Sequence, residues 1–282
     1  MQFMKNCENS TGISGKLDDM KKKATFKDDI SSLSGRYSRQ VLFGPIGIKG
    51  QEMLAKSKVA IIGCGGLGSV LSSNMTRAGT GYLRIIDKDR LELSNLQRQL
   101  LFDEIDVKKK TPKVEAARNK LIKINSDIQI EAIFDEVDEN NISDLIDGFD
   151  LVLDGTDNFK TRLAVNKACV DKRIPFIYGA VAASFGMIYN VIPGSGICLR
   201  CLFREEPDGE NALNCNTVGI INTAVNIIAS IQSTEALKLL TGNGDAMIKG
   251  LINIDIWDLS MDIIEIKKDT EHVCPVCGDK NA

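Results

Sequence analysis

The chain has 282 residues, 43% of them hydrophobic, and a formal charge of −3 at pH 7. This composition suffices for one substantial hydrophobic core and argues against a surface built to bind nucleic acid. The N-terminal stretch carries Lys5 and Glu8 without an apolar segment, and polar residues interrupt the longest apolar stretch, 218–231. We therefore expect a cytoplasmic protein with no secretory signal and no membrane span.

Residues 1–34 are rich in Lys, Asp, Ser and Gly and poor in aromatic residues. Such a segment buries too little apolar surface to fold alone, so we predict a flexible N-terminal extension with at most one short helix, around 17–24. The rest of the chain, 35–282, is predicted to form a single domain.

A glycine-rich turn, GCGGLG at 63–68, follows an apolar run at 58–62 that is typical of a buried parallel strand. Residues 70–78 continue with helical spacing. Glycines let the backbone approach phosphate oxygens, and a helix N-terminus favours negative charge, so this turn predicts a nucleotide site. Its glycines are Gly63, Gly65, Gly66 and Gly68. Asp87 ends the next predicted strand, 82–86, and is expected to hold ribose hydroxyls.

Predicted helices and strands then alternate along the chain. The helix at 113–124 is followed by a strand at 128–133, a short acidic helix, a strand at 151–153, a further helix and a strand at 175–178. This alternation predicts an α/β fold of the Rossmann-like, doubly wound type with a mainly parallel sheet. Beyond Gly179, strand-like runs at 186–192 and within 251–266 predict antiparallel strands, with a long helix at 218–240 between them.

Two acidic residues, Asp154 and Asp157, follow the predicted strand at 151–153. Ligands bind at the carboxyl ends of strands in open α/β sheets, and Mg²⁺ is held there by one or two carboxylates together with phosphate oxygens. Asp157 is the favoured magnesium ligand, whereas Asp154 fits equally well in a turn that caps the next helix. Lys113 and Arg98 are candidate partners for a triphosphate, although each taken alone resembles a solvated surface residue.

Four of the eight cysteines form two C-x-x-C pairs: Cys198, Cys201, Cys274 and Cys277. This spacing predicts a tetrahedral zinc site, and four thiolate ligands leave no open position for water, so the metal is expected to be structural. Cys64 and Cys169 fit a packing role.

Cys215 immediately precedes the predicted helix at 218–240. A helix N-terminus stabilises a thiolate, so Cys215 is either a reactive nucleophile or an ordinary structural thiol. His272 is the only histidine, which disfavours any mechanism that needs a histidine base.

Several motifs together carry a resemblance to a known family. They are RYSRQ at 36–40, the GCGGLG turn, Asp87, SNLQRQ at 94–99, Pro112-Lys113, DGTDN at 154–158, the two cysteine pairs and Cys215. Over residues 36–278 the chain resembles the ThiF/MoeB/HesA adenylyltransferases, bacterial relatives of ubiquitin-activating enzymes. Residues 157–162 are more similar to the ThiF branch, of thiamin thiazole synthesis, than to the MoeB branch, of molybdopterin synthesis.

The resemblance implies a homodimer that uses ATP to adenylate the C-terminal glycine of a small β-grasp sulfur-carrier protein ending in Gly-Gly. A sulfurtransferase or cysteine desulfurase is a further partner that it suggests. It also implies site roles. Ser94, Asn95 and Arg98 would contact adenosine and phosphates, Lys113 would contact phosphate, and Asp157 with Asn158 would form the magnesium site. Arg39 resembles an arginine finger supplied across the dimer interface. Cys215 matches a position that in some relatives bonds the activated carrier or a sulfur donor.

Three alternatives stay open from the sequence. The glycine turn alone allows an NAD-dependent oxidoreductase, against which the SNLQRQ segment stands. A non-catalytic scaffold subunit is opposed by the joint presence of Arg39, Arg98, Lys113 and Asp157. The same chemistry on a peptide or a modified tRNA is the third, although residues 1–35 are too short for the extra recognition domain of the peptide-modifying relatives.

Overall fold

The computed structural model of the protein describes residues 35–194, 197–204, 218–267 and 273–278. The predicted flexible extension, 1–34, lies outside them. Within the described residues, no helix is both long and apolar enough to span a membrane.

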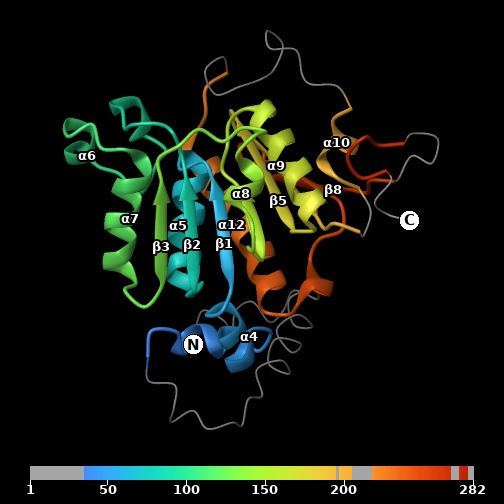
Figure 1. Ribbon diagram of the computed structural model, residues 1–282, viewed down its shortest axis with the longest axis horizontal. Helices are drawn as coiled ribbons and strands as arrows, with labels where there is room; N and C mark the ends of the chain where they lie inside the picture. Colours follow the sequence, from blue (N-terminus) through green and yellow to red (C-terminus); the bar gives the residue numbers. More distant parts are fainter. Residues whose placement is uncertain (1–34, 195–196, 205–217, 268–272, 279–282) are drawn as a thin grey trace, which may run out of the picture.

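A mixed sheet forms the centre of the domain, with the strand order β3-β2-β1-β4-β5-β6-β7-β8 (Figure 1). Its strands are β1 (Lys58–Ile62), β2 (Tyr82–Ile86), β3 (Gln129–Ile133), β4 (Leu151–Asp154), β5 (Phe176–Ala182), β6 (Phe185–Val191), β7 (Leu251–Asp255) and β8 (Ser260–Ile264). The pairs from β3 to β5 are parallel, and those from β5 to β8 are antiparallel. The predicted fold class, a Rossmann-like parallel sheet continued by antiparallel strands, is confirmed.

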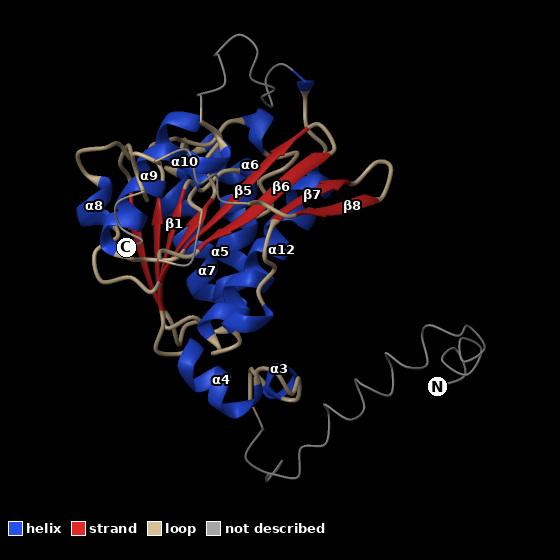
Figure 2. Ribbon diagram, turned by 90° about the vertical axis from the view of Figure 1, so that its right-hand side faces the viewer, coloured by secondary structure: helices blue, strands red, loops and turns tan. Residues whose placement is uncertain are grey.

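Helices cover both faces of the sheet (Figure 2). One face carries α5 (Gly66–Ala78), α7 (Lys113–Ile124) and α12 (Asn222–Leu240), and the other carries α8 (Ile142–Leu145), α9 (Phe159–Lys172) and α10 (Leu199–Leu202). Alternate residues of β1 enter two separate cores, Val59 and Ile61 on the α5 side and Ala60 and Ile62 on the α9 side. This explains why the strand is apolar throughout, since each of its faces is buried.

The predicted element boundaries differ from the structure by several residues at three places. Helix α5 begins at Gly66 rather than Val70, because its first turn, GLGS, has too few apolar residues to show helical periodicity. Strand β5 continues to Ala182 rather than Tyr178, since it pairs with β6 along its whole length. Helix α12 begins at Asn222 rather than Val218, because Ile220 forms a bridge with Ala183 and Ile221 donates its N–H to the Ala183 carbonyl.

Two short helices, α3 (Ser38–Val41) and α4 (Gly47–Leu54), pack at the amino ends of the parallel strands, at the bottom of Figure 1. Gln40 Nε2 donates to the Ala78 carbonyl at 2.9 Å, and Tyr37 accepts a hydrogen bond from Asn125. These contacts fix α3 at the C-terminal ends of α5 and α7. The remaining short elements are η2 (Leu93–Asn95), α6 (Glu104–Lys108) and η3 (Gly244–Ala246).

Candidate functional site

The glycine turn crosses the loop that follows β4, and the two are packed backbone against backbone. A Cβ atom on Gly68 would lie 1.9 Å from the Gly63 carbonyl oxygen, and one on Gly63 would lie 2.6 Å from that of Gly155. Gly63 also has a φ of +88°, which L side chains rarely adopt. Gly63 and Gly68 are therefore required for the shape of the turn.

Gly65 and Gly66 have a different role in the turn. The nearest atom to a Cβ on Gly65 would be Gln99 Nε2, at 3.7 Å, and a Cβ on Gly66 would approach Val225 at 3.1 Å and Arg98 Cδ at 3.9 Å. The N-terminal backbone of α5 is thus flanked by the polar side chains of the 94–99 segment. Such a helix N-terminus, with amide N–H groups and a partial positive charge, is suited to phosphate.

Asp87 follows the carboxyl end of β2 and is half-buried. Its Oδ2 accepts the Cys64 N–H at 2.6 Å, so the carboxylate holds the glycine turn in place. Burial raises the pKa of Asp87, and the positive charge of Lys113 opposes that shift. The buried Lys113 donates from Nζ to Asp89 Oδ2 at 2.7 Å. The structure therefore brings Asp87 and Lys113 together beside the turn.

The 94–99 segment forms η2 and the turn after it. Asn95 Oδ1 accepts the Glu92 N–H, which closes a capping box, and Arg98 Nη1 donates to the Ser94 carbonyl at 3.1 Å. Ser94 is exposed, whereas Asn95 is buried and Arg98 half-buried. Sequence reasoning missed Gln99, which is buried beside Gly65 and whose Oε1 has no hydrogen-bond partner among the described residues. Its place at the end of the SNLQRQ motif was the available signal.

The two acidic residues after β4 have separate roles. Asp154 is 1% exposed, and its Oδ1 accepts from the Thr156 backbone and hydroxyl while its Oδ2 accepts from Arg162. Its carboxylate therefore organises the loop. It does not cap α9, because the N-cap is Asn158, whose Oδ1 accepts the Thr161 N–H at 2.9 Å. Asp157 is exposed at the end of the loop, where a cation can reach it.

Arg162 is a second residue that the sequence analysis did not assign. Its buried guanidinium also donates to the carbonyl oxygens of Thr156, at 2.7 Å, and Gly179, at 3.3 Å. Arg162 thus fixes the loop from α9, although nothing in the local sequence distinguishes it from an ordinary exposed helix residue.

Arg39 lies on α3 and is exposed. Its helix packs at the C-terminal end of α5, whereas the glycine turn is at the N-terminal end (Figure 1). Thirteen residues of helix separate the two ends, a rise of about 20 Å. Within one chain, Arg39 is therefore not part of the site at the glycine turn.

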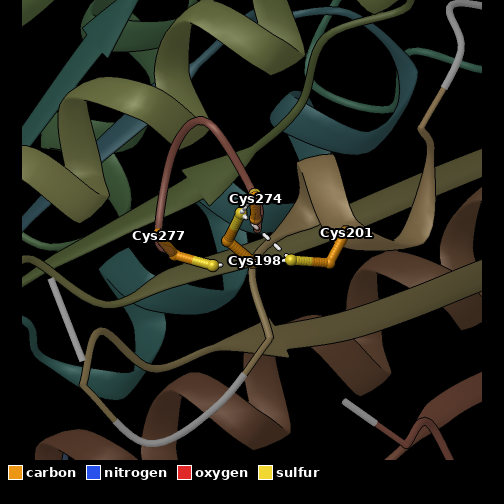
Figure 3. Close-up of side chains that lie close together, drawn as sticks. All are labelled: Cys198, Cys201, Cys274 and Cys277. Carbon is orange, nitrogen blue, oxygen red and sulfur yellow. Dashed lines mark hydrogen bonds between the residues drawn. The ribbon is translucent and has the colours of Figure 1, made fainter. Parts of the chain in front are cut away.

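The four cysteines of the C-x-x-C pairs converge on one point (Figure 3). Their sulfur atoms all lie within 4.8 Å of one another, with 3.8 Å between Cys198 and Cys274 and 3.4 Å between Cys201 and Cys277. Tetrahedral zinc with Zn–S bonds of about 2.3 Å requires sulfur atoms about 3.8 Å apart, so the donor set and its spacing fit this ion. The cluster ties residues 273–278 to α10.

The other cysteines have no such grouping within the described part of the chain. Cys64 and Cys169 are fully buried, and burial raises the pKa of both thiols, which agrees with the predicted packing role. Cys215 and His272 lie outside the described residues.

Comparison with known proteins decides the family. The ThiF family profile matches residues 37–276. The chain belongs to the ThiF family. It is 43% identical to the sulfur carrier protein ThiS adenylyltransferase of Bacillus subtilis, over 88% of this chain and 73% of the relative. It is 35% identical to the SAMP-activating enzyme E1 of Haloferax volcanii, over 86% and 88% respectively.

Among solved structures, the ThiF-family chain is similar to Escherichia coli MccB determined with AMPCPP and MccA. The TM-score is 0.78 at 26% identity, with 94% of this chain and 80% of that chain covered. Family membership also sets aside the oxidoreductase interpretation of the glycine turn.

Proposed function

We propose that this protein is an ATP-dependent adenylyltransferase that activates the C-terminal glycine of a small β-grasp sulfur-carrier protein, of the ThiS or MoaD type. The observation that carries the proposal is the grouping of Asp87, Lys113 and Arg98 around the N-terminal turn of α5. The name of the Bacillus subtilis relative supports a sulfur carrier as the acceptor.

The chemistry is a displacement at the α-phosphorus of ATP. A carboxylate oxygen of the carrier's last glycine attacks the phosphorus, the bond to the bridging oxygen breaks, and pyrophosphate leaves with that electron pair. A carboxylate is already ionised at neutral pH, so no general base is needed. The protein contributes by positioning the reactants and by stabilising negative charge on the phosphate oxygens.

Each predicted residue has a part in this scheme. The backbone of Gly65 and Gly66 and the guanidinium of Arg98 would bind phosphates. Asp87 would hold the ribose, and Ser94 and Asn95 would lie against adenosine. Lys113 is oriented by its ion pair with Asp89, which keeps the ammonium beside Asp87 and the glycine turn.

Magnesium would be held by Asp157 rather than Asp154, because Arg162 and Thr156 already occupy the Asp154 carboxylate. Asn158 would contribute indirectly, since its side-chain oxygen caps α9. The ion would supply positive charge to the triphosphate. Zinc, bound by Cys198, Cys201, Cys274 and Cys277, would be structural.

A homodimer would complete the site. Because α3, which carries Arg39, packs at the far end of α5 from the glycine turn, Arg39 would serve the partner's site rather than its own. This agrees with the role that the family resemblance implies for Arg39. After adenylation, a sulfurtransferase or cysteine desulfurase would deliver sulfur, with Cys215 as a candidate covalent acceptor.

Exchange of labelled pyrophosphate into ATP tests the proposal directly. We expect exchange that requires Mg²⁺ and a carrier ending in Gly-Gly. A carrier lacking its terminal glycine is the matched control and should give none. Comparing ThiS-type with MoaD-type carriers would separate the two pathways. Exchange that is unaffected by removal of the terminal glycine would contradict the mechanism, and its absence with every carrier would favour a scaffold role or a peptide or tRNA substrate.

A further inference from the structure

Asn166 is a fully buried polar residue in the middle of α9. Its Oδ1 accepts the backbone N–H of Leu199 at 2.8 Å. Leu199 is the first residue of α10 and directly follows Cys198. One half of the amide therefore holds the backbone of the first cysteine pair.

The other half of the amide lacks a conventional partner. Asn166 Nδ2 is buried and has no hydrogen-bond partner among the described residues. Oδ1 of the same amide is bonded to the residue directly after Cys198, so the unpaired N–H belongs to a side chain that borders Cys198 and its sulfur. Buried donors are nearly always paired, so the sulfur is the acceptor this amide is placed to serve.

A metal-bound thiolate is a better acceptor than a thiol, because it carries negative charge. Groups that donate to coordinating atoms orient the ligands and tune the metal, and removing them weakens metal binding. The Asn166 amide can serve both functions, since its oxygen fixes the backbone beside Cys198 and its nitrogen is a buried donor without a partner among the described residues.

Helix α9 also connects the cysteine cluster to the loop that follows β4. Arg162, one helical turn before Asn166, holds the loop 154–158 through Asp154 and Thr156. Residues four apart lie on the same helix face. The same face of α9 therefore secures both the loop with Asp157 and the cysteine cluster.

We propose that Asn166 is a positioning residue of the metal centre, which fixes the Cys198 pair to α9 and donates a hydrogen bond from Nδ2 to the metal-bound Cys198 sulfur. This inference rests on the proposed zinc site. It predicts that the amide affects two properties of the site: the affinity of the four cysteines for their metal, and the energy of the sulfur-to-metal charge-transfer band.

The test uses the full-length protein loaded with Zn²⁺ or Co²⁺ and two variants. Asn166→Asp keeps an acceptor for Leu199 but replaces the donor with oxygen, and Asn166→Leu removes both. We expect chelator competition to show zinc binding weakened roughly 10–100-fold in both. In the cobalt form of Asn166→Asp, the sulfur-to-cobalt charge-transfer band should move to lower energy, because the thiolate loses a hydrogen bond.

Asn125→Leu is the matched control. Asn125 is equally buried but donates to Tyr37 and Thr76, away from the cysteines. It should lower stability without moving the cobalt band. Wild-type zinc affinity and an unchanged cobalt spectrum in folded Asn166→Asp would overturn the inference. Failure of the wild-type protein to bind either metal would instead refute the zinc site itself.

Discussion

Arg162 and Asp154 form a buried ion pair, with 3.1 Å between Nε and Oδ2, at the base of the loop that carries Asp157. Replacing Arg162 with Leu would leave the Asp154 carboxylate buried without its counter-ion, and the loss of one partner from such a pair costs about 3–5 kcal/mol. We expect urea denaturation to show a drop of this size in the free energy of unfolding.

Lys172→Ala is the control for that experiment. Lys172 pairs with the exposed Asp147, and surface pairs contribute little to stability. If Arg162→Leu were no less stable than Lys172→Ala, the buried pair would have no role in holding the loop.

Asp157→Ala should reduce pyrophosphate exchange by more than about 10²-fold, the size expected on removing a main electrostatic contributor. The folding stability should change little, because the side chain is exposed. Exchange rates and melting temperatures measure the two effects separately. Asp245→Ala, which removes an exposed carboxylate from η3, should exchange normally. A near-normal rate for Asp157→Ala would remove the magnesium assignment.

Arg39 should act on the partner's site. Mixing Arg39→Ala subunits with Asp157→Ala subunits would regenerate one site with both residues in each heterodimer, so exchange should return although each variant alone is inactive. Subunit exchange is verified with a distinguishable tag on one variant. Inactivity after verified mixing would count against the arginine finger.

Metal analysis should find about one zinc per chain, and Cys274→Ser should weaken its binding and expose residues 273–278 to protease. The free energy of metal binding contributes to folding, so the melting temperature should fall as well. ATP binding should survive at least partly, since the cysteines lie outside the nucleotide loops. If the purified protein contains no zinc and chelators do not change its stability, the cysteine cluster must have another role, such as a redox pair.

Cys215→Ala should impair sulfur transfer to the carrier while sparing pyrophosphate exchange, since exchange needs only the phosphate site. A thiol that captures the acyl-adenylate or a persulfide should also give a covalent adduct in mass spectrometry of a trapped reaction. Cys169→Ala, which removes a buried thiol on α9, serves as a check on general thiol effects in the same assay. Equal thiocarboxylate yield from Cys215→Ala and wild type would show that the thiol is dispensable.

The sequence alone determined the fold class and the candidate residues of the site. Strands that are buried on both faces appear in the sequence as apolar runs. GCGGLG, SNLQRQ and the C-x-x-C pairs are short motifs that can be recognised beside the predicted strands and helices. Each of these features depends on a few consecutive residues, so it can be recognised from the sequence without a structure. The convergence of the four cysteines was predicted from spacing alone and agrees with their positions.

Only the tertiary structure decided which residues meet across long separations. The role of Asp154 was ambiguous in the sequence because it depends on the contact with Arg162 and on the burial of both residues. The local sequence does not show whether a charged residue on a helix is buried. Gly63 and Gly68 are required by their contacts with each other and with the loop at Gly155, far along the chain. The place of Arg39 and the orientation of Asn166 likewise follow from how α3 and α9 pack, because packing joins segments that no local pattern relates.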